Sequence, residues 1–258
     1  MFWWIVAAAA AYFVKGLCGF ANTLVFTSIL SFTSDNVNIT PTEIFLSYPT
    51  NFIVLFKERK NIKLKVFLPL SALVLLGCIP GIFFLKNANS GIVKVLFGLI
   101  IIYIGLEMLF RDIREARTKK KSKASKFTLL TIGLVSGILC GIYGIGALLG
   151  AYIGRVTNNI HEFKANICAV FFVEGTFRII VYAFSGIFTI ESLKIGLMLV
   201  PVMLIFLFLG LWSGKFINEK IAKKIVIIML VLSGVALIIN SRDSIYELYN
   251  NVMSYIKA

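Results

Sequence analysis

The sequence has few of the residues from which metal centres and hydrolytic sites are built. It contains one histidine, and its four cysteines stand singly in apolar segments, without the close spacing typical of zinc, haem or iron–sulfur sites. It also lacks the H-E-x-x-H, G-x-S-x-G and Walker A motifs. We therefore expect no metal, no cofactor, no enzymatic activity and no direct use of ATP.

Charged residues are missing from long stretches of the chain. Val66–Leu85 and Ile195–Gly214 are 20 uncharged residues each, and Phe127–Gly154 has 28. About 20 apolar residues span the roughly 30 Å hydrocarbon core of a bilayer. The sequence therefore predicts an all-α polytopic protein of the cell membrane. We expect eight hydrophobic segments: 2–33, 44–56, 65–85, 91–110, 127–154, 165–190, 193–214 and 220–240.

Half of the 26 basic residues lie in two short runs, although the net charge is +14 overall. Lys57–Lys65 holds five of them and Arg111–Lys126 holds eight. Both runs flank hydrophobic segments, where lysine and arginine mark the cytoplasmic side of a membrane. We therefore expect contact with the lipid bilayer and no nucleic-acid partner. Residues 111–126 are predicted as a basic cytoplasmic linker between membrane repeats 1–110 and 127–240, and 241–258 as a short amphipathic tail.

One passage of the chain occurs twice. Lys-Gly-Leu-Cys-Gly-Phe-Ala at 15–21 returns 125 residues later as Cys-Gly-Ile-Tyr-Gly-Ile-Gly at 140–146, with both glycines in register. Such duplications are typical of secondary transporters, which bind substrate at the midplane between the two copies. Dense glycine also weakens a helix. We therefore predict two homologous four-segment repeats, with helix interruptions near Gly16–Asn22 and Gly141–Gly146, close together at the midplane.

Two topologies are compatible with this pattern. If the first segment of each repeat crosses the membrane fully, the repeats are parallel. If each is a re-entrant hairpin that turns at its glycines, the repeats are inverted. The distribution of lysine and arginine favours the inverted arrangement without deciding the matter.

Several motifs, in this order and spacing, resemble the TauE/SafE (sulfite exporter) family of membrane transporters. They are G-L-C-G-F-A-N at 16–22, K-E-R-K-N-I-K at 57–63, L-G-C-I-P-G at 76–81, G-I-L-C-G-I-Y-G-I-G-A at 137–147 and K-A-N-I-C-A-V-F-F-V-E-G-T-F-R at 164–178. The resemblance covers residues 2–240. It implies transport, with export the expected direction, of a small anion such as sulfite, a sulfonate or another sulfur-containing or carboxylated anion.

Broken helices suit such a substrate, because helix N-termini present free backbone N–H groups and a partial positive charge. Glycine also lets a ligand approach the backbone closely. We therefore predict two facing anion-binding turns; the alternative is that these glycines only pack helices together. The turns would be formed by Gly16 and Gly19 in the first repeat and by Gly141, Gly144 and Gly146 in the second.

Charges within apolar segments are costly and are usually functional. Glu174 and Arg178 stand four residues apart, so they share a helix face and can pair. Arg178 is a candidate for substrate binding and Glu174 for proton coupling; the alternative is a purely structural ion pair. Lys15, beside the first glycine turn, is a second coupling candidate or else extends to the membrane surface. Coupling to protons or to sodium stays open.

Uncharged side chains complete the predicted site. Asn22, Asn51 and Thr176 are hydrogen-bonding residues within or beside apolar segments, and Asn51 and Thr176 occupy matching positions in the two copies. They are candidate substrate ligands, with interhelical hydrogen bonding as the alternative. A different class of function, a membrane assembly or scaffold subunit without transport activity, stays open. The oligomeric state is not determined by the sequence.

Overall fold

The computed structural model describes residues 1–18, 21–117 and 126–213, with single positions beyond 213. Within these ranges the chain is helical, with nine α-helices and one short 3-10 helix, η1. The elements are α1 (Phe2–Cys18), α2 (Asn22–Leu30), α3 (Asn36–Glu58), η1 (Arg59–Asn61), α4 (Leu64–Asn87), α5 (Ser90–Arg117), α6 (Lys126–Tyr143), α7 (Ala147–Val156), α8 (Ile160–Ser185) and α9 (Ile190–Ser213).

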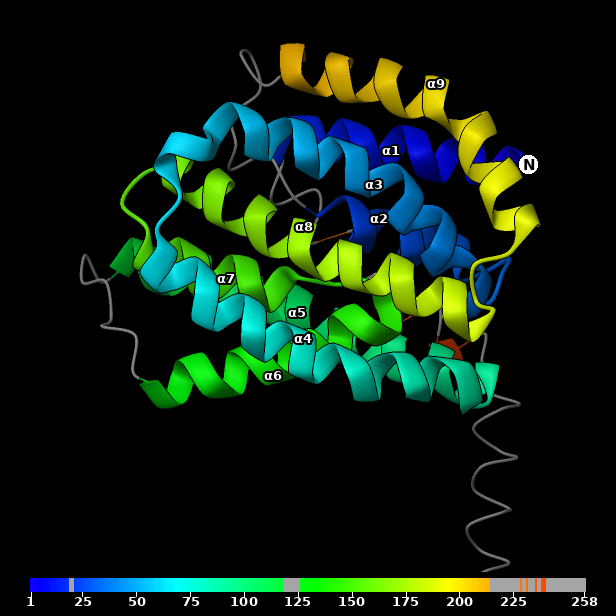
Figure 1. The fold of residues 1–258 in the computed structure, drawn as a ribbon, viewed down its shortest axis with the longest axis horizontal. Coiled ribbons are helices and arrows are strands. Elements are labelled where there is room, and N and C mark those ends of the chain that lie inside the picture. Colours follow the sequence, from blue (N-terminus) through cyan, green and yellow to red (C-terminus); the bar gives the residue numbers. More distant parts are fainter. Residues whose placement is uncertain are drawn as a thin grey trace, which may run out of the picture.

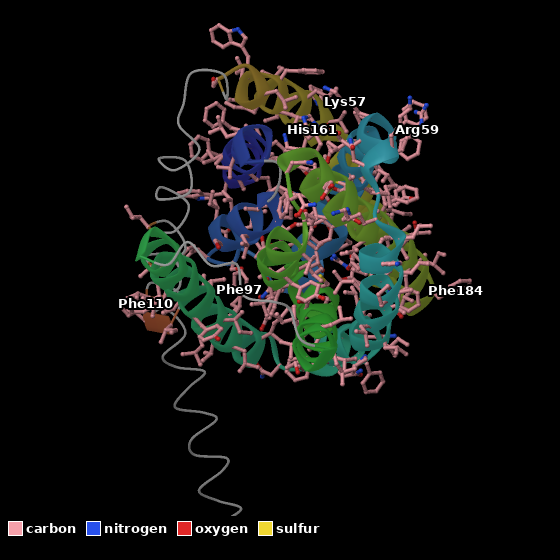
Figure 2. All side chains as sticks on the ribbon, turned by 90° about the vertical axis from the view of Figure 1, so that its left-hand side faces the viewer. Lys57, Arg59, Phe97, Phe110, His161 and Phe184 are labelled. Atoms are coloured by element: carbon pink, nitrogen blue, oxygen red, sulfur yellow. The ribbon has the colours of Figure 1, made fainter. Side chains whose placement is uncertain are left out.

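The outer surface of this helical bundle is apolar, as a lipid-facing surface must be. Three helices in the described ranges, α4, α8 and α9, are long and apolar enough to cross a membrane. Figure 2 shows Phe110 and Phe184 projecting outward, whereas Phe97 lies inside the bundle. Lys57, Arg59 and His161 lie at one end of the same view. This separation of apolar flanks from a basic end fits a protein that spans the bilayer.

The helices form three groups, with α3 and α8 in the middle (Figure 1). Helix α1 packs against α9 on one side, and α4 packs against α6 on the other. Glycines make both contacts close. A Cβ at Gly16 would lie 2.6 Å from the Leu207 carbonyl oxygen of α9, and a Cβ at Gly141 would lie 2.5 Å from the Cys78 carbonyl oxygen of α4. The helix backbones therefore meet without side chains between them.

Both predicted helix interruptions are confirmed. Helix α1 ends at Cys18 and α2 begins at Asn22, while α6 ends at Tyr143 and α7 begins at Ala147. Each break includes a residue with left-handed backbone, Ala21 at φ 72° and Gly144 at φ 74°. Figure 1 shows α2 turning back from the end of α1, against which it packs. We call α1–α2 and α6–α7 the first and second broken hairpins.

Other sequence predictions concern the start of a helix, the linker and the C-terminal part of the chain. The second apolar segment is predicted at 44–56, but the helix that contains it, α3, begins at Asn36. The apolar pattern does not reveal this start, because the buried residues before Ile44 are mostly polar. Helix α5 continues through Arg117, so the first part of the predicted 111–126 linker is helical. The last apolar segment, predicted at 220–240, lies outside the continuously described ranges, and the predicted tail at 241–258 lies outside the described residues altogether.

Candidate anion site at the helix breaks

A small polar cavity lies where the two broken hairpins meet α3 and α8. We call it the junction cavity; its volume is about 20 Å³. A space of this size holds about one water molecule, so an anion the size of sulfite enters only if the surrounding helices move apart. The cavity is lined by Asn22, Thr23, Glu43, Ile44, Ser47, Asn51, Gly144, Phe171, Glu174 and Arg178.

Arg178 and Glu174 form an ion pair on α8 at the wall of the cavity. The guanidinium Nη1 donates to Glu174 Oε1 at 3.2 Å, and both side chains are almost fully buried. Arg178 Nε donates to the Tyr182 hydroxyl at 3.3 Å. The third nitrogen, Nη2, is buried and has no hydrogen-bond partner among the residues that the structure describes. Because a buried donor without a partner costs about 1–3 kcal/mol, Arg178 has unused capacity to bind an acceptor.

Gly144 brings the second helix break against this arginine. A Cβ at Gly144 would lie 3.0 Å from Arg178 Nη1, 3.2 Å from Nη2 and 2.9 Å from Thr23 Cγ2 of α2. The two breaks therefore lie next to each other, as predicted. Both the left-handed backbone and the close contacts require glycine at this position.

Glu43 is a site residue that the sequence analysis did not identify. Its Oε1 accepts hydrogen bonds from Asn22 Nδ2 at 2.9 Å and from Thr23 Oγ1 at 2.7 Å, and it is 1% exposed. The sequence interpretation placed Glu43 at the border of an apolar segment, whereas it lies within α3. A signal was present: Glu43, Ser47 and Asn51 recur every fourth residue and so form one polar helix face.

Lys15, in the last turn of α1 just before the first break, reaches α3. Its Nζ donates to Thr50 Oγ1 at 2.6 Å and to Asn51 Oδ1 at 3.0 Å, and the side chain is buried. Lys15, Arg178, Glu43 and Glu174 thus place two positive and two negative groups in one buried region. Since unbalanced charge is costly within a membrane, this balance keeps the region stable.

The remaining predicted site residues have other surroundings. Gly16 and Gly141 lie in the helix contacts described above, and Gly146 lies against the Phe171 ring. Thr176 pairs with the Tyr48 hydroxyl at 3.0 Å and does not line the junction cavity. Gly19 lies outside the described residues. The predicted residues that line the cavity are Asn22, Asn51, Gly144, Glu174 and Arg178.

The Sulfite exporter TauE/SafE family model matches residues 4–237 of the chain. The chain belongs to the TauE/SafE family. The resemblance drawn from the glycine motifs is thereby confirmed, and this TauE/SafE protein is a membrane transporter with transmembrane helices rather than an enzyme. No match was found among curated proteins or among solved structures.

Proposed function

We propose that this TauE/SafE protein exports a small sulfur-containing or carboxylated anion, such as sulfite or a sulfonate, and that the anion binds at the junction cavity. The observation that carries the proposal is Arg178 Nη2, a buried cationic donor at the wall of that cavity that has no partner within the described part of the chain. Arg178 and Glu174 then have different roles: the arginine faces the substrate, and the carboxylate holds the arginine in place.

The first turn of α2 adds donors next to Arg178. A helix leaves its first N–H groups without intrahelical partners, and they carry a partial positive charge. The N-cap residue of α2, Ala21, makes no side-chain capping hydrogen bond. Because Asn22 and Thr23 of this turn line the same cavity, an anion there can contact the arginine and the helix terminus together. Because Gly144 has no side chain, it leaves room for the anion beside the arginine and the helix terminus.

The packing also supports two inverted repeats, 1–110 and 127–240. The contact of α1 with α9 has a counterpart in the contact of α6 with α4. In the first, Gly16 meets Gly210; in the second, Gly141 meets Gly81. Each hairpin thus packs on the α-helix that follows α3 or α8 in the other half, which is the third apolar segment of that half. The reversal of the chain at both breaks favours the re-entrant form of the first segment, and with it inverted repeats in the plasma membrane.

Transport requires the junction cavity to open alternately to each side, because it is too small for an anion in this conformation. At Gly16 and Gly210, and at Gly141 and Gly81, the backbones of α1 and α9 and of α6 and α4 meet directly. These contacts are suited to the movement of one group against another around α3 and α8. Coupling to an ion depends on the buried charges beside the cavity, with Lys15 and Glu174 among them.

Exchange across liposomes tests this function. Purified protein is reconstituted with unlabelled sulfite inside, and entry of radiolabelled sulfite is followed at equal pH on both sides. We expect entry above that of protein-free liposomes, with competition by isethionate or acetate if sulfonates or carboxylates are also bound. A scaffold subunit without transport activity would show no entry with any of these anions, and that result would exclude the proposal.

Arg178→Lys is a matched variant for the same assay. It keeps the positive charge but removes the planar group that contacts Glu174, Tyr182 and the cavity together. Reduced exchange with unchanged protein yield supports direct binding of the anion by the guanidinium. Unchanged exchange would mean that only the charge matters at this position.

A further inference from the structure

Glu43 occupies the donors that a substrate anion would use. Its carboxylate oxygen accepts from Asn22 Nδ2 and Thr23 Oγ1, both in the first turn of α2, and all three residues line the junction cavity. We propose that Glu43 is an internal substitute for the substrate: ionised, it holds these donors, and it takes up one proton when the transported anion replaces it. This inference rests on the proposed anion transport and adds its coupling ion and stoichiometry.

The surroundings of Glu43 differ from those of Glu174. Glu174 has a guanidinium at 3.2 Å, which stabilises its ionised form. In the described part of the chain, Glu43 has only neutral donors within hydrogen-bond distance. A buried carboxylate without a cation in contact is costly unless it is neutralised. Glu43 is therefore the carboxyl group that exchanges a proton more readily.

The protonated form of Glu43 can also be accommodated. The Thr23 hydroxyl donates to ionised Glu43, but it can equally accept a hydrogen bond from a carboxylic acid. The Asn22 side-chain oxygen can also accept a hydrogen bond from the carboxylic acid if the amide group rotates. Protonation thus removes the need for two donors and leaves the Asn22 NH₂ and the first turn of α2 available to the anion.

Charge balance sets the transport stoichiometry at one proton for each negative charge on the transported anion. With all four groups ionised, the two positive and two negative charges cancel. A monovalent anion adds one negative charge to this buried region, and a proton on Glu43 removes one. The proton enters from the water on the side of anion entry and leaves on the other side, so that export by this route is driven by the outward gradient of the anion. The titratable or charged groups near Glu43 are Tyr12, Lys15, Cys140, Glu174 and Arg178.

A sodium ion explains the geometry less well. Sodium requires several oxygen ligands directed at one point, whereas the Asn22 and Thr23 groups that face Glu43 Oε1 are placed as hydrogen-bond donors. We therefore assign the coupling to a proton.

Two assays with sulfite as the probe separate this inference from the proposed function. Exchange at equal pH measures anion transport alone. Accumulation driven by an imposed pH gradient, in sodium-free medium, measures coupling. Glu43→Gln imitates the protonated side chain, and Glu58→Gln is the matched control, because Glu58 also lies on α3 but pairs with His161, away from the cavity.

We expect Glu43→Gln to lose gradient-driven accumulation of sulfite while its exchange at equal pH stays measurable above protein-free liposomes, and Glu58→Gln to retain both. Should Glu43→Gln not fold, Glu43→Asp provides the test. Its shorter side chain withdraws the competing carboxylate from Asn22 and Thr23, so the KM for sulfite exchange at alkaline pH should fall at least threefold.

Three results would overturn the inference. In the first, Glu43→Gln accumulates sulfite as wild type does. In the second, the folded Glu43→Gln loses exchange, or Glu43→Asp leaves the KM unchanged. In the third, accumulation by the wild type requires sodium. Absence of exchange by the wild type would instead exclude sulfite transport itself, and this inference with it.

Discussion

Gly144 and Gly186 have the same left-handed backbone conformation but different surroundings. Alanine substitution at both positions therefore separates the effect of backbone strain from an effect on the anion site. Their φ angles are 74° and 72°. Alanine in the left-handed region costs about 1–2 kcal/mol, and both variants should lose about this much stability. A Cβ at Gly186 meets no atom of the described residues within 4 Å, whereas a Cβ at Gly144 lies 3.0 Å from Arg178 Nη1 and 2.9 Å from Thr23 Cγ2.

The added methyl group therefore has a specific consequence at Gly144. Ordinary carbon contacts are about 3.5–4.0 Å, so the guanidinium must retreat by several tenths of an ångström. A misplacement of about 1 Å at a reacting group costs about a hundredfold in rate; by the same reasoning we expect on the order of a tenfold fall in sulfite exchange for Gly144→Ala.

Two measurements check this prediction. Melting temperatures of the purified variants should fall together, and liposome exchange per folded protein should fall only for Gly144→Ala. Equal exchange by Gly144→Ala and Gly186→Ala would show that Gly144 serves the turn alone and would refute its place in the anion site.

Three further variants test other parts of the structure. Arg178→Gln should reduce sulfite exchange roughly thirtyfold or more, since removal of one partner from a buried charged contact costs about 2–5 kcal/mol. The double variant Glu174→Gln/Arg178→Gln should stay inactive. Restored exchange in the double variant would identify a purely structural ion pair. Gly210→Ala should lower thermal stability by about 1–3 kcal/mol, because its Cβ would meet the Phe13 carbonyl oxygen of α1; an unchanged melting temperature would contradict this. Ala21→Gly should raise the melting temperature by relieving up to about 1 kcal/mol of left-handed strain, and no rise would mean that the strain is offset elsewhere.

The two helix breaks and the Arg178–Glu174 pair could be predicted because their signals are local. Glycine density weakens a helix wherever it occurs, and a spacing of four residues places two side chains on one helix face. The site residues Asn22, Gly144 and Arg178 follow from these signals, since they lie in or beside the duplicated turns and on the same charged face.

The role of Glu43 could not be found in this way, because the four-residue spacing of Glu43, Ser47 and Asn51 indicates a polar helix face but not its contacts with another helix. Helix α3 begins with buried polar residues and contains Pro41 and Pro49, so its sequence resembles a loop before an apolar segment. Only the packed structure brings Glu43 to Asn22, a residue of a different helix. In the same way, Gly16 and Gly141 carry the repeat signal, but their contacts with α9 and α4 depend on tertiary packing.

The location of a bound anion tests the central claim most directly. Selenite is an electron-rich analogue of sulfite, so anomalous scattering from crystals soaked in it identifies the anion without ambiguity. We predict a selenite peak within hydrogen-bond distance of Arg178 Nη2 and the first turn of α2, with Glu43 displaced from Asn22 and Thr23. Ordered selenite at any other place in the protein, with the junction cavity and Glu43 unchanged, would contradict the account.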